Sequence, residues 1–169
     1  STSRGLGDVY KRQHTWFECK IRYEKVMENG MQKKVTEPYL VDALSFTEAE
    51  ARIIEEMTPF ISGEFTVSDI KRANYSELFP SDEESADRWF KCKLIFITLD
   101  EKSGAEKKTS TQVLVQAADL RDAVKKLDEG MKGTMADYQI GMVSETPLMD
   151  VYPYSAEPND KPEFDPSKA

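Results

Sequence analysis

Apolar and polar residues alternate along two stretches of the chain, which is the pattern of a β-strand with two different faces. In the first stretch, over residues 16–27, one face carries Phe17, Cys19, Ile21 and Tyr23. In the second stretch, which begins at Trp89, the matching face carries Phe90, Cys92, Leu94 and Phe96. We expect both apolar faces to lie in the interior, where the two cysteines would act as small hydrophobic residues.

After each of these strands the pattern predicts a tight turn, a second strand, a helix and a third strand. The turns fall at Asn29-Gly30 and Ser103-Gly104, because short hairpins favour residues that adopt a positive φ. The second strands are expected over 34–43 and 109–117, and the third strands over 64–73 and 137–144.

The two helices are expected to begin after Ser45 and Asp119, since both residue types are favoured as N-caps. Ser45 and Glu48 also have the spacing of a capping box. Apolar residues then recur at helical spacing on one face of each segment. They are Phe46, Ala49, Ile53, Ile54 and Met57 in the first helix, and Leu120, Ala123, Val124, Leu127 and Met131 in the second.

The two series of elements also match in sequence. The six residues from Trp16 resemble the six from Trp89, 73 positions further along the chain. Matching residues continue in the same order, from Gly30 and Gly104 to the blocks 77–80 and 150–153. Collinear agreement over such a length indicates an internal duplication.

These patterns predict an α+β protein, built as a tandem duplication of a ββαβ unit. One such unit is small for an independent core. We therefore expect the copies to pack about a pseudo-twofold axis around one joint core, as an antiparallel sheet with two helices on one side. The first copy is assigned to residues 14–80, an acidic solvated linker to 81–87, and the second copy to 88–154.

The two ends of the chain have a different character. Residues 1–13 resemble a translated fragment of a sequencing-library transposon end, and we interpret them as a non-native leader; an ordinary N-terminal tail is the alternative. Residues 155–169 are rich in proline and charge, which is typical of a disordered acidic tail. No function is assigned to residues 1–13 from sequence.

Composition excludes several classes of protein. The formal net charge is −8, which disfavours a broad basic surface for duplex DNA. No apolar run is long enough to span a bilayer, and no secretory leader is evident, so we expect a cytoplasmic protein. With two cysteines and the single histidine His14, the sequence suggests no zinc spacing, no disulfide framework and no cofactor.

The most specific candidate site lies on the second face of the first strand in each copy. Both copies place a tryptophan and a lysine four residues apart on this face. Aromatic rings with interleaved cations can hold single-stranded nucleic acid, because bases stack on the rings and phosphates pair with the cations. The candidate residues are Trp16, Lys20, Arg22, Trp89, Lys91 and Lys93.

Other interpretations stay open. The tryptophans could cap a core while the charges are simply solvated, and this structural interpretation is the simplest. A second functional hypothesis is a protein-interaction module that acts through a sheet edge, the acidic linker or the acidic tail. No nucleophile elbow or phosphate-binding glycine loop is found, so we do not expect an enzyme. The oligomeric state is not predicted.

Three blocks of sequence resemble a known family. They are residues 16–20, residues 34–43 (Lys-Val-Thr-Glu-Pro-Tyr-Leu-Val-Asp-Ala) and residues 45–51 (Ser-Phe-Thr-Glu-Ala-Glu-Ala). They are similar to the bacterial family known as domain of unknown function 4494, and the resemblance extends over residues 14–154. The resemblance implies a small cytoplasmic protein and carries over no catalytic residue.

Overall fold

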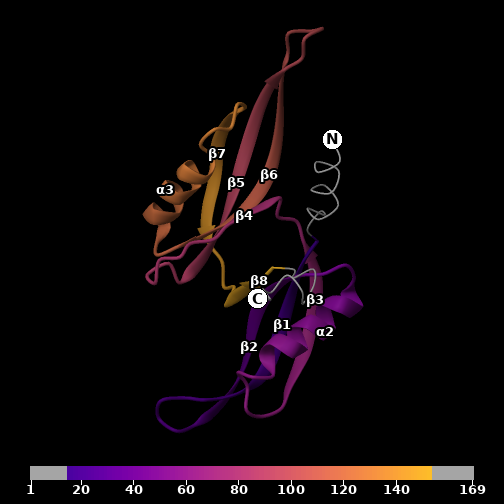
Figure 1. Ribbon diagram of the computed structural model, residues 1–169, viewed down its shortest axis with the longest axis vertical. Helices are drawn as coiled ribbons and strands as arrows, with labels where there is room; N and C mark the ends of the chain where they lie inside the picture. The colour runs from indigo at the N-terminus through magenta and orange to yellow at the C-terminus, as the bar shows by residue number, and fades with distance from the viewer. Residues whose placement is uncertain (1–14, 154–169) are drawn as a thin grey trace, which may run out of the picture. The chain divides into compact units, whose positions relative to one another are not determined.

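The computed structural model describes residues 15–153, and it confirms the α+β class (Figure 1). The described residues form two compact units, each with one four-stranded sheet and one helix. The first unit comprises residues 15–34, 39–72 and 151–153, and the second comprises 35–38 and 73–150.

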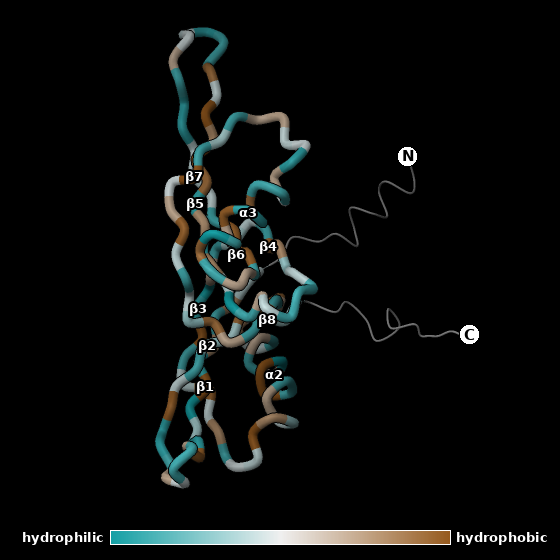
Figure 2. Tube along the Cα trace, turned by 90° about the vertical axis from the view of Figure 1, so that its left-hand side faces the viewer, coloured by the Kyte–Doolittle hydropathy of each residue, from teal (hydrophilic) through white to brown (hydrophobic). Residues whose placement is uncertain are grey.

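The first unit has the strand order β3-β1-β2-β8. Its elements are β1 (Trp16–Val26), β2 (Gln32–Asp42), α2 (Phe46–Met57), β3 (Phe65–Ala73) and β8 (Asp150–Tyr152). Gly30 has a φ of 83°, which confirms the predicted hairpin turn between β1 and β2. Apolar and polar residues alternate along the coil of α2, whose apolar side packs on the sheet (Figure 2).

The second unit has the strand order β4-β6-β5-β7. Its elements are β4 (Glu77–Phe79), β5 (Arg88–Leu99), β6 (Glu106–Ala117), α3 (Leu120–Gly130) and β7 (Asp137–Glu145). β5 is antiparallel to β6 and to β7, whereas β4 runs parallel to β6. The expected all-antiparallel sheet is therefore wrong at β4.

Both predicted helix caps are present. The Ser45 side chain accepts a hydrogen bond from the Glu48 backbone N–H, and the Glu48 carboxylate accepts one from Leu44. In α3, Asp119 accepts from the Asp122 N–H at 2.8 Å, while Asp122 accepts from the N–H of Ala118. This second bond lowers the pKa of Asp122 and completes a capping box that the sequence had shown only for the first helix.

The expected joint core between the two copies stays a prediction. The structure has a separate core cluster on the helix side of each sheet. The first contains Phe17, Cys19, Ile21, Val41, Ala43, Ala49, Ile53 and Met57. The second contains Phe90, Cys92, Leu94, Val113, Val115, Ala117, Ala123 and Leu127. One helix against three long strands encloses a dry cluster without help from the other helix, because both faces are apolar at the right spacing.

The order β3-β1-β2-β8 of the first sheet corresponds to the order β7-β5-β6-β4 of the second. The short strand of each sheet, however, comes from the chain segment that follows the long strands of the other sheet, so the short strands are exchanged. β4 follows β3 in the chain and joins the second sheet, while β8 follows β7 and joins the first sheet. The two compact units meet along the chain at residues 72 and 73 and again at 150 and 151, while the repeat boundaries at 80 and 88 stay predictions. The duplication itself, and its pseudo-twofold axis, stay predictions.

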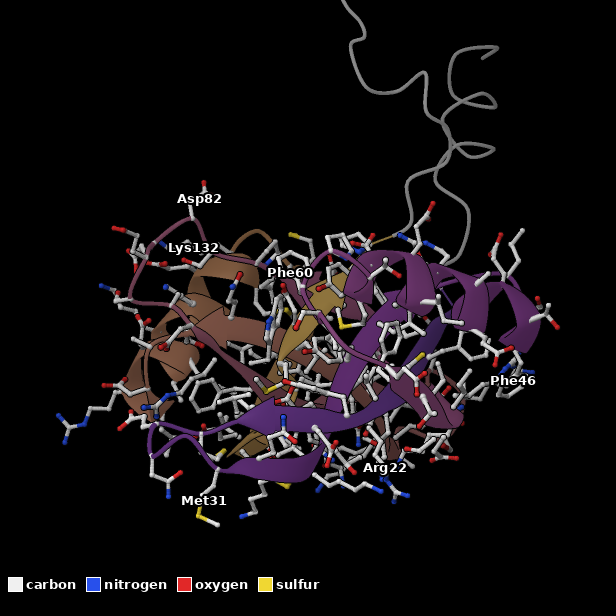
Figure 3. All side chains as sticks on the ribbon, turned by 90° about the horizontal axis from the view of Figure 1, so that it is seen from below. Arg22, Met31, Phe46, Phe60, Asp82 and Lys132 are labelled. Atoms are coloured by element: carbon white, nitrogen blue, oxygen red, sulfur yellow. The ribbon has the colours of Figure 1, made fainter. Side chains whose placement is uncertain are left out.

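One cation on each helix binds the segment that follows the exchanged strand. In the first unit, the Arg52 guanidinium donates to the Pro153 carbonyl at 3.2 Å and to the carbonyl of Asp42. In the second unit, the Lys126 ammonium donates to Ser81 Oγ at 2.9 Å and to Glu83 at 2.8 Å. The acidic linker 81–87 is thus anchored at its start, although Asp82 projects outward from it (Figure 3).

Candidate protein-binding edge

The six candidate nucleic-acid residues lie on the sheet faces opposite the helices. Their strand neighbours, such as Phe17 and Phe90, belong to the two core clusters on the helix side. Alternation along each strand therefore puts the candidates on the other face, as the sequence predicted. Trp16, Lys20 and Arg22 lie in the first unit, and Trp89, Lys91 and Lys93 lie in the second.

The tryptophan rings are not accessible on these faces. Trp16 is 3% exposed and Trp89 is 5% exposed. A base stacks on a ring whose face is open, so rings this little exposed give the stacking role no support, and that role stays a prediction. Burial is the favoured outcome for such a large apolar side chain, which gains more than most from leaving water.

The four cations differ in their surroundings. Arg22 is exposed, and its side chain points away from the sheet (Figure 3). Lys20, Lys91 and Lys93 are half-buried. Lys91 lies opposite Leu114 and Ser144 in the ladder, and Lys93 lies opposite Gln112 and Met142. Lys91 and Lys93 therefore have neutral cross-strand neighbours and form no continuous basic surface with them.

The two cysteines are free and buried. Burial raises the pKa of Cys19 to about 12 and that of Cys92 to about 11. The carboxylates of Glu18, Asp69 and Glu50 add to the increase for Cys19. A nucleophilic cysteine needs a lowered pKa, so neither thiol is suited to that chemistry.

A cleft of about 490 Å³ lies beside Lys126 in the second unit. Its walls include Phe79, Pro80 and the side chain of Glu129. The three protons of the Lys126 ammonium are used by Ser81, Glu83 and Asp122, the last at 3.0 Å. The cleft therefore presents no spare cation to an anionic ligand.

Within residues 15–153, no group of three or more potential metal ligands comes together. In the same residues, no helix has both the length and the apolarity that crossing a bilayer requires.

The two units differ most at their open sheet edges. The long edge strands are β3 in the first sheet and β7 in the second. β3 carries Asp69, Lys71 and Arg72, and charges on an edge strand oppose the pairing of a further strand. β7 carries no charge and no proline between Asp137 and Glu145.

The outward-facing backbone groups of β7 follow from its pairing with β5. The Thr146 N–H donates to the Trp89 carbonyl, so Thr146, Ser144 and Met142 direct their backbone groups toward β5. Val143 and Glu145 alternate with them and direct their N–H and C=O groups away from the sheet. The strand has a bulge at Gly141, where a Cβ would lie 2.9 Å from Ile95 Cδ1. The regular part of the open edge therefore runs from Met142 to Glu145.

The helix α3 lies next to β7 (Figure 1). Tyr138, Ile140 and Val143 on the inner face of β7 are half-buried against the second core cluster. The Tyr138 hydroxyl donates to Asp128 of α3 at 3.4 Å, which identifies the side of the helix that faces β7. Burial and the Asp128 charge raise the pKa of Tyr138.

The same side of α3 carries Leu120 and Val124, four residues apart. Leu120 is 52% exposed and Val124 is half-buried. The open edge of β7 thus has an apolar strip next to it, on the helix side of the sheet. We call this combination the β7 edge: the backbone of Met142–Glu145, the inner face of β7, and Leu120 and Val124.

Sequence reasoning named a sheet edge only in general terms and did not select β7. A signal was present in the sequence, since the third strand of the first copy is charged and that of the second copy is not. Strand order, which decides which strand lies at an edge, could not be obtained from either copy alone.

The described residues therefore form an α+β fold with two sheets, in which the long edge strand β7 is uncharged from Tyr138 to Ser144. Residues 15–154 match the model of a family described as a domain of unknown function, DUF4494. The chain belongs to this family, as the resemblance implied. No curated protein matches the chain.

Proposed function

We propose that this protein is a non-catalytic binding protein that holds an extended segment of a partner protein at the β7 edge. The observation that carries this proposal is the edge strand β7, which is uncharged from Tyr138 to Ser144 and has outward-facing backbone groups at Val143 and Glu145. A partner strand added there would gain main-chain hydrogen bonds, and its alternate side chains would contact the apolar strip. The two free thiols support a cytoplasmic location.

Single-stranded nucleic acid was the first expectation from sequence, and it fits less well. Stacking would require open rings at Trp16 and Trp89, and both are buried. The half-buried lysines alone would offer a few charge contacts without base recognition. Protein binding needs no such open rings.

The proposal can be tested by selecting random peptides, displayed on phage, against the full chain. Selected peptides are expected to lose binding to a Val143→Pro variant. Proline removes the N–H of residue 143, which points outward, so the ladder with β5 is kept while the edge is blocked. Ala73→Pro, at the end of the β3 edge, provides the matched control and should bind the same peptides.

Amide hydrogen exchange provides the structural measurement. A bound peptide is expected to slow exchange at Val143 and Glu145 and to leave β3 unchanged. Peptides that bind equally well to Val143→Pro would overturn the proposal, and so would a selection that yields no binder.

Two further measurements separate the alternatives. An oligothymidylate is expected to leave tryptophan fluorescence unchanged at low salt; quenching that weakens as salt rises would restore the nucleic-acid hypothesis. A dimer of the chain that Val143→Pro dissociates would replace the partner protein with a second copy of this chain.

A further inference from the structure

We infer that the segment held at the β7 edge is acidic as well as apolar, because two exposed cations of α3 border the apolar strip. This inference rests on the proposed function and specifies the chemistry of the partner. The cations are Arg121 and Lys125.

The helical repeat places both cations on the β7 side of α3. Arg121 precedes Asp128 by seven residues, which is two turns, and Lys125 precedes it by three. Asp128 accepts the hydrogen bond from Tyr138 of β7, so this side of the helix faces the edge strand. Lys126, by contrast, points to the other side and is bound to Ser81 and Glu83.

Arg121 and Lys125 are both exposed. Neither forms a hydrogen bond or an ion pair with any residue in the described part of the chain. Among the helix carboxylates, Asp122 is bound to Lys126 and its pKa is also lowered by the charge of Lys125, while Asp128 accepts from Tyr138. Glu129 lies four residues after Lys125, whereas Arg121 has no carboxylate three or four residues away on the helix. Arg121 is therefore the more available of the two charges.

The geometry of strand addition brings these charges within reach. An added strand lies roughly 4.8 Å from its neighbour, and every second side chain points to one face of the sheet. On the helix side, those side chains would meet Leu120 and Val124 first and the two cations next. Apolar residues and carboxylates that alternate on the helix-facing side would match both features.

On the face of the sheet away from α3, the added strand would meet no charged side chain of β7 between Tyr138 and Ser144. The open-face neighbours on β7 are Gln139, Met142 and Ser144, which are polar or flexible and carry no charge. The charge preference is therefore expected to come from the α3 side.

Three synthetic peptides of about eight residues test the inference. In each peptide, threonine occupies every second position. The remaining positions carry valine and the variable residue in turn. The variable residue is glutamate, glutamine or lysine. We expect the glutamate peptide to bind about tenfold more tightly than the glutamine peptide at low salt, and the lysine peptide to bind most weakly.

The charge-reversed variant Arg121→Glu with Lys125→Glu should invert this order. Lys107→Glu with Lys108→Glu makes the same change of net charge on β6, and should leave the order unchanged. If the reversed variant is poorly folded by amide exchange, Arg121→Gln with Lys125→Gln should reduce the preference to about none.

The outcomes separate this inference from the proposed function. If all three peptides slow exchange at Val143 equally, the edge binds strands without a charge preference and the inference fails. If none of them does so, while selected peptides bind elsewhere, both proposals fail. A preference that the reversal does not change would also overturn the inference.

Discussion

In the first unit the long edge strand β3 carries Asp69, Lys71 and Arg72, whereas in the second unit β7 is uncharged from Tyr138 to Ser144. The strand order around them is otherwise equivalent. Charges on β3 disfavour the addition of a strand, and their absence from β7 permits it. Under the proposed function, two units with equivalent strand order and similar cores would differ in binding through a few side chains on an edge strand.

Substitutions in the two core clusters are expected to have the largest effect on stability. Phe17→Ala and Phe90→Ala each remove a buried ring from one core cluster, and each should lower the free energy of unfolding by about 3–5 kcal/mol. Amide exchange should show the loss of protection mainly in the unit that carries the substitution. Leu44→Ala, at an exposed position, is the control and should change little. Equal loss in both units after either substitution would mean that the two clusters behave as one.

The thiols provide the next test. Cys19 and Cys92 have pKa values raised to about 12 and about 11 by burial, so they stay protonated in the fold when unfolded thiols ionise. Stability is therefore complete below pH 9 and falls as the pH rises, by about 1.4 kcal/mol per pH unit for each thiol. The loss continues to a higher pH for Cys19 than for Cys92.

Chemical denaturation at roughly unit pH intervals between about pH 8.5 and 11 measures the free energy of unfolding of the wild type and of the cysteine variants. Cys19→Ala and Cys92→Ala should each remove one part of the pH dependence, so that the difference from the wild type isolates the thiol from other titrating groups. A wild-type slope identical to that of the double variant would show that the thiols ionise normally.

The helix cations give the smallest effect. Lys126→Met leaves Ser81 Oγ and the carboxylates of Glu83 and Asp122 without their cation, and should cost about 1–2 kcal/mol. Exchange should increase first in β4 and at the start of the linker. Lys125→Met, at an exposed neighbouring position, should cost almost nothing, and an equal cost for both variants would contradict the anchoring role.

The local elements could be predicted from sequence because their signals are local. The turns at Gly30 and Gly104, the caps at Ser45 and Asp119, and the inward faces of the first strands all follow from residues close together in the chain. β4 and β8 were recognised only as matching blocks, since three-residue strands have too little periodicity to identify.

The candidate site could be predicted only in part. Alternation separated the Trp16 face from the Phe17 face correctly, but alternation does not say whether the second face is covered. The number of cores depended on strand order, and so did the choice of edge strand. Both properties arise from pairing between distant segments, which one sequence does not specify.

The position of β8 has a consequence for synthesis on the ribosome. The first sheet receives its fourth strand from residues 150–152, which are translated only after the whole of the second unit. At typical rates of elongation, the nascent first unit waits roughly 4–16 seconds for that strand. During this interval the side of β2 that later pairs with β8 is open, and a chaperone or a neighbouring nascent chain could reach it.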